Sequence, residues 1–410
     1  MSSFFPIVAS LGEPSAAELL VRQDVEFLLE ALEAVPDPRD PRGIRYSLPV
    51  VLGLAVFAAC CGAATFEEIG EVAADLDRTV LAGFGCTRRA PSAATFRRLI
   101  NTCNPDVLDE ALCVWASGLR IGQDPPQPRP ELVGLPGVRA VVSLDGKTLK
   151  GARSFDAEGV MTQAQVLEAY DHATRAVVAQ VEIAGGDENA AGIAMVHRLA
   201  ARPGGLTGVV IIADAKHTTR ELTALVTALG GYWVFTVKGN APTAHLVLAG
   251  LPWSQVPIGA VTRDKGHGRR ETRTIRVLQV PDHVGVPLTG TVQAAAVRRT
   301  VWRKKTVTTP HAWAHETVLV ATSLPARAAA PARLAAIVRE HWRIEALHWQ
   351  RDVVFDEDRH TAHTGHGPRN LACLRNTAIT RTHRTGAPCL SKALRAANRR
   401  PQRALAAIAK

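Results

Sequence analysis

The sequence predicts an α/β fold: a mixed β-sheet covered by helices, with an N-terminal all-helical domain and a β-rich insertion. Two short apolar runs, VVSLD (residues 141–145) and VVIIAD (209–214), have the composition of buried strands. Segments with helical spacing alternate with such runs, and this alternation predicts helices on the faces of a sheet. Residues 47–120, in contrast, have the pattern of several consecutive helices. We therefore expect a helical domain followed by a sheet domain.

The N-terminal part of the chain is predicted to be helical. Residues 1–38 form a helical lead-in and residues 39–122 a helical domain, with a turn-rich DPRDPRG sequence at the boundary. The segment PSAATFRRLI (91–100) begins with a Pro-Ser helix signal. Together with the helix predicted before it, this segment could form a helix-turn-helix-like module that exposes Arg97 and Arg98 to DNA. An ordinary helical bundle explains the same pattern equally well.

A proline-rich linker separates this domain from the first part of the sheet. Residues 123–138 hold five prolines, a composition typical of linkers. Residues 139–240 follow with strand-like and helix-like segments. The alternating runs at 165–171 and 175–183 predict a β-hairpin, and residues 187–200 have the spacing of a helix. We expect these residues to form the first part of the core.

The rest of the chain divides into three further parts. Residues 241–325 alternate apolar and polar side chains between Gly and Pro turns, which predicts a β-rich insertion. Residues 326–390 return to helical spacing and are expected to complete the core. Residues 391–410 are predicted to form a basic tail.

The formal net charge of +10 is concentrated near the end of the chain. Residues 359–410 contain eleven Lys and Arg and no Asp or Glu, whereas the preceding 358 residues carry 37 basic and 38 acidic side chains. Clustered cations bind polyanions because each phosphate contact releases counterions. The pattern therefore favours a nucleic-acid partner over the alternative, a basic helix that faces solvent.

The cysteines and the apolar runs predict a cytoplasmic protein with no membrane partner. The seven cysteines form no C-x-x-C pair and include the adjacent Cys60 and Cys61, which favours reduced thiols over a disulfide framework or a zinc ribbon. The most apolar run, residues 48–64, contains Pro49 and is too short to span a bilayer comfortably. We expect this run to be a buried helix.

Asp145 and Asp214 stand at the carboxyl ends of the two most apolar strands. Sites gather at such strand ends, and two carboxylates aimed at one place repel each other unless a proton or a cation intervenes. Mg²⁺ binds carboxylates together with phosphate oxygens, and a pair of such ions can promote an in-line displacement. Each residue also has a simpler interpretation, because Asp145-Gly146 is a turn dipeptide and Asp214 could cap the following helix.

Glu345, within HWRIEALHWQRD, is the third candidate acid. Helical spacing places four polar side chains on one face: His341, Glu345, His348 and Asp352. Trp342 and Trp349 flank this face, and we expect them to pack inward and anchor the helix to the sheet. The alternative is a surface glutamate that pairs with Arg343 or Arg351.

Sequence blocks spread over most of the chain carry a resemblance to a known family. The blocks are DPRDPRGIRYSLPVVLGLAVFAA, FEEIGEVA, PSAATFRRL, VVSLDGKTLKGAR, IIADAKHTTR, FTVKGN, KGHGRRETR, HWRIEALHWQRDVVFDED and GHGPRNLACLRNTAI. In this order, from about residue 37 nearly to the end, they resemble the DDE transposases of bacterial insertion sequences. The resemblance is to the IS-four group and, within it, to the ISAs-type subgroup that includes the H-repeat-associated proteins.

The resemblance implies a ribonuclease H-like core in which Asp145, Asp214 and Glu345 form the catalytic, metal-binding triad. The implied ion is Mg²⁺, with Mn²⁺ as a substitute. Phosphate contacts are expected from six basic side chains: Lys147, Lys238, His267, Arg269, Arg273 and His341. The alternatives are solvated loop charge for the first five and a place beside the metal for His341. The chain also departs from the broader group, which carries a lysine at the position of Asp352.

The function implied by the resemblance is transposition. Metal-dependent cleavage at the element ends would free a 3′-hydroxyl, which then attacks target DNA in the same site. The partners would be double-stranded DNA, both terminal inverted repeats and target, and further copies of the chain in a homodimer or multimer. The reaction would take place on nucleoid DNA in the bacterial cytoplasm. Two alternatives remain open: a transposase-derived DNA-binding protein without transposition activity, and a stand-alone ribonuclease H-like nuclease.

Overall fold

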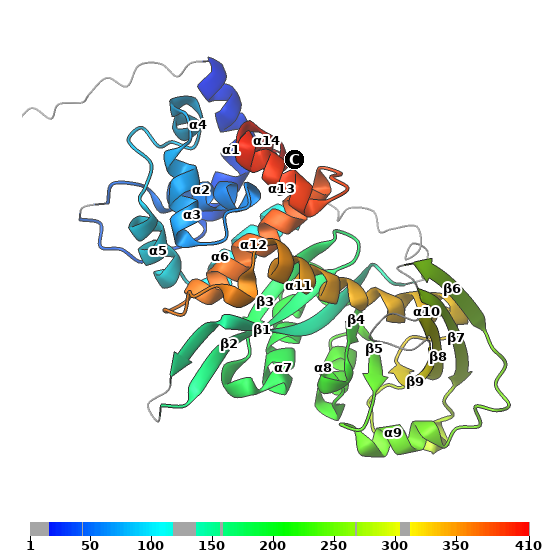
Figure 1. Cartoon of the computed structure of the whole chain (residues 1–410). Helices are drawn as coiled ribbons and strands as arrows, with labels where there is room; N and C mark the ends of the chain where they lie inside the picture. The colour runs from blue at the N-terminus through cyan, green and yellow to red at the C-terminus, as the bar shows by residue number, and fades with distance from the viewer. Residues whose placement is uncertain are drawn as a thin grey trace, which may run out of the picture.

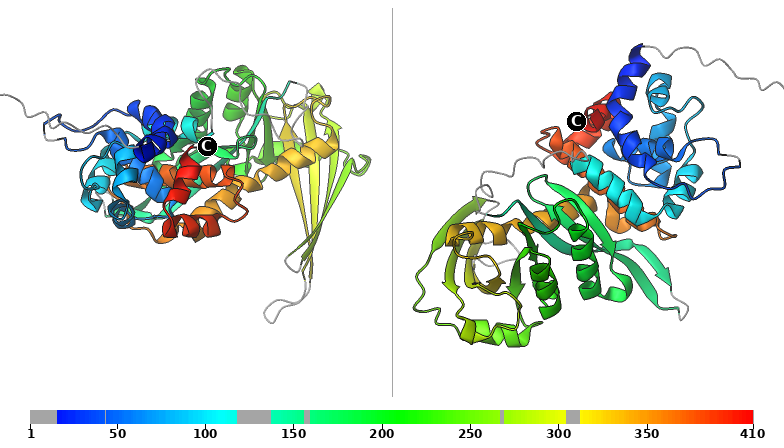
Figure 2. Two further views of the ribbon diagram at one scale, coloured as in Figure 1. Left: turned by 90° about the horizontal axis from the view of Figure 1, so that it is seen from above. Right: turned by 180° about the vertical axis from the view of Figure 1, so that it is seen from behind.

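The computed structural model describes residues 16–42, 44–117, 137–155, 159–266, 269–303 and 312–409. Both ends of the described chain lie in one helical body, and the middle of the chain forms a sheet body (Figure 1). Three consecutive helices run from the sheet body into the helical body (Figures 1 and 2): α10 (Pro331–Glu340), α11 (Trp342–Val354) and α12 (Gly367–Arg384). These helices connect the two bodies.

The N-terminal part of the helical body confirms the predicted all-helical domain. Its helices are α1 (Ala16–Glu33), α2 (Leu48–Cys60), α3 (Phe66–Ala74), α4 (Arg78–Gly83), α5 (Ala93–Thr102) and α6 (Pro105–Ser117). Helix α2 is the predicted apolar helix, and every residue in it except Pro49 is buried. A helix that is apolar on all sides needs cover on all sides, and the neighbouring helices supply it. Among the described helices, none combines the length and apolarity that crossing a membrane requires.

The end of the chain completes the helical body. Helices α13 (Leu390–Arg399) and α14 (Gln402–Ala409) occupy the segment predicted as a basic tail, and they bury Leu394 and Leu405. Exposed basic residues lie on their other faces. The charge near the end of the chain is nevertheless only partly available to a partner, because Arg369, Arg375 and Arg381 of α12 are buried.

One nine-stranded sheet forms the other body, in the order β3-β2-β1-β4-β5-β9-β8-β7-β6. Its first five strands are β1 (Ala140–Phe155), β2 (Met161–Asp171), β3 (Ala176–Glu182), β4 (Val209–Ala213) and β5 (Tyr232–Val237). Strands β1 to β3 are antiparallel, and β4 and β5 run parallel to β1. This order and these directions confirm the predicted ribonuclease H-like core and the predicted hairpin.

The predicted β-rich insertion extends the same sheet. It consists of α9 (Pro242–Ala249), β6 (Ala260–Gly266), β7 (Arg269–Gln279), β8 (Gln293–Arg303) and β9 (Ala312–Thr322). Strand β9 pairs antiparallel with β5, so the insertion continues the core sheet rather than standing apart from it. The predicted linker lies largely outside the described residues, which resume at residue 137.

The two faces of the core sheet are covered by different helices. Successive side chains of a strand point to opposite faces. Val142 and Leu144 belong to the cluster that includes α7 (Glu188–Ala200) and α8 (Arg220–Ala228). Val141 and Ile212 belong to the cluster that includes α10. Asp145 lies four positions after Val141 on β1, and Asp214 lies two positions after Ile212, just beyond β4. Both side chains therefore point toward the side of α10 and α11.

Short 3-10 turns connect several of these elements. They are η1 (Ala184–Gly186), η2 (Ala215–His217), η3 (Asp282–Val284) and η4 (Glu357–Arg359). The second follows β4 directly and the fourth follows α11, so both lie next to the residues considered below.

Candidate active site

Asp145 and Asp214 lie side by side where β1 and β4 stop pairing. The parallel register of these strands ends at Leu144 opposite Ala213, and each aspartate is the next residue. By the alternation of side chains, both carboxylates point toward α11. The sequence therefore predicts the neighbouring positions of the two acids correctly, although it places Asp145 at the end of its strand.

The prediction that β1 ends at Asp145 is wrong. The strand continues to Phe155, because beyond Leu144 it keeps a second partner, and Asp145 and Gly146 pair with Glu168 and Leu167 of β2. This extended pairing also excludes the interpretation of Asp145-Gly146 as a turn.

The capping interpretation of Asp214 is found in the structure. Its carboxylate accepts a hydrogen bond from the backbone N–H of Lys216 at 3.0 Å and begins the turn η2. Capping a turn does not exclude a further role, because a carboxylate has lone pairs for several partners.

Helix α11 brings Glu345 to the two aspartates. The pKa of Glu345 is raised by partial burial and by the negative charge of Asp145, with a smaller contribution from Asp214. The alternative pairing is not found, because Arg343 pairs with Glu340 and Arg351 pairs with buried carboxylates. Part of the Glu345 side chain remains exposed to solvent. The two aspartates thus lie close enough to Glu345 at this edge of the sheet for their charges to act on it.

His348 is a site residue whose role the sequence does not reveal. Its Nδ1 lies 3.4 Å from Asp145 Oδ2, and its Nε2 lies 2.8 Å from Glu168 Oε2. Burial acts to lower the pKa of His348, but hydrogen bonds to Asp145 and Glu168 raise it overall. A protonated imidazole between two carboxylates holds Asp145 in place and offsets its charge.

Behind His348 lies a buried ionic network that connects α11 to the sheet and to α12. Glu168 is fully buried on β2 and accepts hydrogen bonds from Arg351 and, at 2.7 Å, from Asn376. Arg351 also donates to Glu357 at 2.9 Å, and Glu357 pairs with Arg375 at 2.6 Å. Each buried charge thus faces an opposite charge, as burial requires. The available signal in the sequence is Glu168, a charged residue between the apolar Leu167 and Ala169 of β2.

Lys147 lies inside the protein rather than at a phosphate-binding surface. Its side chain is 7% exposed, and Nζ lies 2.6 Å from Asp352 Oδ1, with Glu357 and Asp358 at 3.9 and 4.0 Å. In this conformation the ammonium is not free to contact DNA. The ion pair also gives Asp352 a structural role, because its carboxylate is the nearest counter-charge of Lys147.

Replacing Asp352 by Asn should lower the free energy of unfolding by about 1–2 kcal/mol, because Lys147 would lose its nearest counter-charge at a largely buried position. The loss is limited because Glu357 and Asp358 remain nearby. Urea unfolding measures the change. Asp75→Asn, at an exposed helix end, is the control and should change stability by less than about 0.5 kcal/mol. Equal stability of the two variants would contradict this account of the ion pair.

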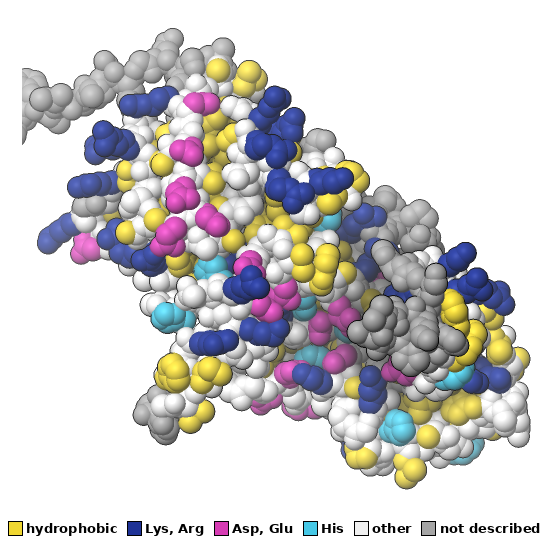
Figure 3. Space-filling view, viewed as in Figure 1, with side chains coloured by type: hydrophobic (Ala, Val, Ile, Leu, Met, Phe, Trp, Pro, Cys, Tyr) yellow, Lys and Arg dark blue, Asp and Glu magenta, His cyan; other side chains and the backbone are white. Residues whose placement is uncertain are grey.

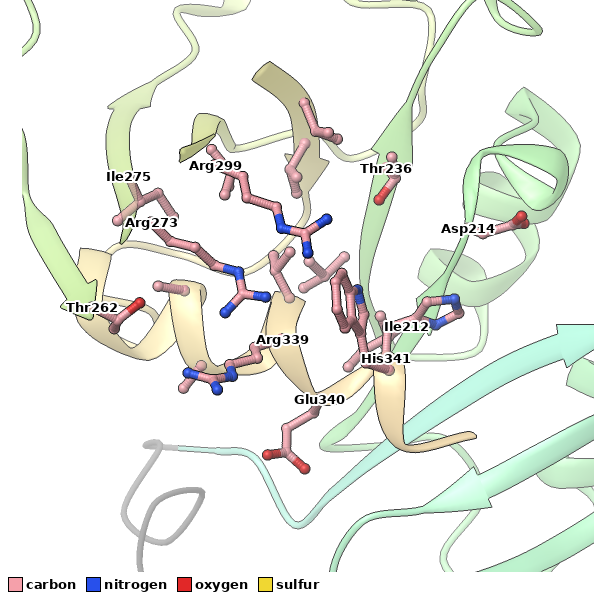
Figure 4. Close-up of a pocket in the computed structure, with 18 of the residues that line it drawn as sticks. Ile212, Asp214, Thr236, Thr262, Arg273, Ile275, Arg299, Arg339, Glu340 and His341 are labelled. Atoms are coloured by element: carbon pink, nitrogen blue, oxygen red, sulfur yellow. The ribbon is translucent and has the colours of Figure 1, made fainter. Parts of the chain in front are cut away.

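A cavity of about 660 Å³ opens beside the acids, between the core and the insertion. Asp214, Lys238, His341 and Glu345 line its side toward the core, and the pKa of buried His341 is lowered, mainly by burial. Arginines from β7, β8 and α10 point toward one another on its other side (Figure 4): Arg273, Arg299 and Arg339. Basic side chains are thus placed next to a group of carboxylates.

The two tryptophans of α11 do not pack inward, and that expectation is wrong, although Trp342 contacts strands of the inserted part of the sheet. Trp342 is 42% exposed, and Trp349 is 61% exposed. The indole of Trp342 lies between the guanidinium groups of Arg273 and Arg299, at 5.0 and 4.9 Å from the ring centroid. Arginines stack on indole faces through cation–π attraction. Trp342 therefore connects α11 to the insertion, while the buried Ile344 and Leu347 face the core.

The remaining candidate DNA contacts have different environments. Arg269 lines a second hollow of about 470 Å³ that shares Arg273 with the first cavity. His267 lies outside the described residues. In the helical body Arg97 and Arg98 are both exposed, but Arg97 pairs with Glu67 and lies 5.9 Å from the ring centroid of Phe66, whereas Arg98 forms no ion pair within the described residues. The two adjacent arginines are therefore not equivalent.

The donor chemistry of the acidic site fits a hard divalent cation. Asp145, Asp214 and Glu345 offer carboxylate oxygens, the donors that Mg²⁺ prefers, and burial together with the charges of the two aspartates raises the pKa of Glu345. Within the described part of the chain, however, no three His, Cys, Asp or Glu side chains are arranged to hold one ion. Binding of one ion by all three acids would thus require other rotamers of their side chains.

Comparison with known proteins identifies the family. The sequence model described as "Transposase DDE domain" matches residues 136–381, and that described as "DDE_Tnp_1-associated" matches residues 29–116. The protein YbfL of Escherichia coli (strain K12) is 23% identical over 376 residues, which cover 87% of this chain and 90% of YbfL. The "H repeat-associated putative transposase YhhI" of the same strain is 23% identical with the same coverage.

Two further similarities are more distant or partial. An uncharacterised protein of Xanthobacter autotrophicus is 28% identical over 251 residues, which cover 60% of this chain and 78% of that protein. A piggyBac transposase, solved in a synaptic complex with hairpin DNA, aligns with a TM-score of 0.40 and 12% identity over 92% of this chain and 78% of its own. The Transposase DDE domain alone spans more than half of the sequence, and the chain belongs to the DDE transposase family.

Proposed function

We propose that the chain cleaves DNA at the ends of a mobile element and joins the freed 3′-hydroxyl to target DNA. Hydrolysis of a phosphodiester consumes one water and leaves a 3′-hydroxyl and a 5′-phosphate. In the second step that 3′-hydroxyl attacks a target phosphodiester, and the target's own 3′-oxygen leaves. The observation that carries the proposal is the group of three carboxylates at one sheet edge: Asp145 and Asp214 follow the last paired residues of β1 and β4, and α11 brings Glu345 near enough that their charges, together with burial, raise its pKa.

Asp145, Asp214 and Glu345 would hold the divalent ions, Mg²⁺ or Mn²⁺ as a substitute. When bound, these ions would supply the positive charge that lets a phosphate approach the carboxylates and that stabilises the in-line displacement. His348 would keep Asp145 oriented through the contact between Nδ1 and the carboxylate. A ligand held in this way keeps its geometry through the reaction.

The basic side chains around the cavity would hold the DNA strand. Lys238 lines the cavity on the side of the acids and can neutralise a backbone phosphate there, whereas Arg273, on the other side, already pairs with Glu271 and Asp264 and would have to exchange these partners for a phosphate. Transposition must hold two element ends together, so we propose that the chain acts as a dimer or multimer assembled on double-stranded DNA. This reaction would take place on nucleoid DNA in the cytoplasm.

The direct test uses purified chain and a duplex that contains the element's terminal inverted repeat. We expect Mg²⁺-dependent nicking at the end of the repeat and joining of the product to a second duplex, both abolished in Asp145→Ala. Nicking that survives Asp145→Ala would contradict the proposal. Binding without cleavage would indicate a DNA-binding protein, and cleavage without end specificity or joining would indicate a nuclease.

A further inference from the structure

A third hollow, of about 760 Å³, lies on the helical body. None of its lining residues also lines the cavity beside the acids. Its lining is dominated by one residue type, with five arginines: Arg39, Arg42, Arg45, Arg89 and Arg98. Among the described residues that line it, Asp40 is the only acid. On the face drawn in Figure 3, Lys and Arg side chains stand out along the outer edge of the helical body. A surface with this concentration of positive charge attracts a polyanionic ligand.

Hydrogen bonds between residues distant in the sequence connect the walls of this hollow. The hydroxyl of Tyr46 donates to the carbonyl oxygen of Arg89 at 2.8 Å, a bond that spans 43 residues. The guanidinium of Arg39 donates to the carbonyl oxygen of Tyr46 at 2.8 Å and pairs with Asp37 at 2.6 Å. Arg39 therefore has a structural role in the frame, and its charge is already offset by Asp37.

The guanidinium groups of the other four arginines have no structural role comparable to that of Arg39. Arg42, Arg45, Arg89 and Arg98 are exposed, and among the described residues their guanidinium groups form no ion pair. Asp40 forms no ion pair with these four arginines, and its carboxylate accepts a hydrogen bond from the backbone N–H of Arg42 at 2.8 Å. Four like charges around one hollow repel one another unless a ligand offsets them.

We propose that these four residues, the arginine pocket (Arg42, Arg45, Arg89 and Arg98), bind backbone phosphates of double-stranded DNA. The inference rests on the proposed function, because a transposase must hold DNA outside its catalytic site in order to position an end. Guanidinium groups offer paired N–H donors that match phosphate oxygens and remain charged at all physiological pH values. Phosphate contacts fix the position of DNA without reading its sequence.

The pocket distinguishes the two arginines of α5. Arg98 belongs to it, whereas Arg97 does not line it and is held by Glu67 and Phe66. Residues 39–42 and 44–46, residue 89 and helix α5 therefore line one surface, although Tyr46 and Arg89 are 43 residues apart in the sequence. DNA seated there would contact the helical body through several phosphates at once.

The test measures how salt weakens binding of the full-length chain to a short fluorescent duplex of arbitrary sequence. For every phosphate that a variant no longer neutralises, the slope of log affinity against log salt should become shallower by about 0.9. The slope of the triple variant Arg42→Gln/Arg45→Gln/Arg89→Gln should therefore be shallower by between about 2 and 3, and that of Arg98→Gln by about 1. The change should be similar for duplexes of unrelated sequence.

The control removes the same charge elsewhere. Arg78→Gln, at an exposed position on α4 outside the pocket, should leave the slope unchanged. Circular dichroism and thermal unfolding verify that all variants fold, which is expected because the substituted side chains are exposed. A triple variant with the same slope as the unmodified chain would overturn the inference, even if cleavage is normal. Shallower slopes as predicted, in a chain that never cleaves DNA, would support the pocket and contradict the proposed function.

Discussion

Replacing Glu345 by Gln should slow metal-dependent DNA cleavage by at least about a thousandfold and leave the protein no less stable. Substituting residues that merely orient metal ligands commonly costs about 10–100-fold in activity or metal affinity, so losing a ligand should cost more. Gln keeps the size of Glu345 and removes its charge, so the effect would report the carboxylate itself. Single-turnover nicking of a labelled duplex carrying the terminal repeat measures it.

The stability expected for this variant follows from the pKa of Glu345. Burial and the charge of Asp145 raise that pKa, so the ionised carboxylate is less favourable in the folded chain than in the unfolded one. Gln removes the repulsion, and without metal the melting temperature should stay the same or rise. A functional group that costs stability is expected at an active site.

Metal binding gives a readout that does not depend on cleavage. Added Mg²⁺ should raise the melting temperature of the unmodified chain, because an ion that binds the folded state stabilises it by mass action. The shift should be smaller in Glu345→Gln. Val353→Ala, at an exposed position on the same helix, should leave both cleavage and the metal-induced shift unchanged. Normal cleavage with a normal shift in Glu345→Gln would exclude Glu345 from the metal site.

The sequence predicts the core where local pattern and burial agree. Strand β4 is apolar throughout and the hairpin of β2 and β3 alternates, so their ranges are close to those predicted. The end of β1 is not predictable in this way. Beyond Asp145 the strand is held by its pairing with β2, and its side chains carry no regular alternation. Helix α9 is also absent from the prediction, since it lies in a stretch interpreted as β-rich.

Some features of the site are likewise predictable from neighbouring residues, whereas others depend on residues that are distant in the sequence. Strand ends predict that Asp145 and Asp214 approach each other, and the resemblance to DDE transposases implies that Glu345 joins them. The contacts around these acids join residues that are far apart in the sequence. His348 and Glu168 are separated by 180 residues, and Lys147 and Asp352 by 205. Exposure depends on distant partners too. Trp342 is apolar but stacks on arginines of the insertion, and Arg375 is charged but buried.

Replacing Arg351 by Met should lower the free energy of unfolding by about 3–5 kcal/mol, the cost of removing one partner from a fully buried ion pair. Arg351 and Glu168 are both completely buried, and Arg351 also pairs with Glu357 at 2.7 Å. The variant would leave two carboxylates in the interior with too few positive partners. Denaturant unfolding measures the loss, and Glu357→Gln should give a smaller loss of about 1–3 kcal/mol if the first variant fails to fold.

The pH dependence should separate this charge effect from a packing effect. Burial acts to raise the pKa values of Glu168 and Glu357, but Arg351 and its neighbours hold both well below the ordinary value of 4.5. Their contribution to stability is therefore complete above about pH 4.5 and is lost as the pH falls toward the folded-state pKa values. The difference in stability between the unmodified chain and Arg351→Met should accordingly shrink below that pH.

A matched substitution on the same helix tests whether burial is the cause. Arg343 pairs with Glu340, but its side chain is 41% exposed, so Arg343→Met should cost no more than about 1 kcal/mol. Equal losses at the two positions, or a loss at Arg351 that does not change with pH, would indicate that packing rather than charge holds α11. If the charge network holds the helix, it also fixes the position of Glu345. Variants that weaken the network should then bind Mg²⁺ less tightly even where the chain remains folded.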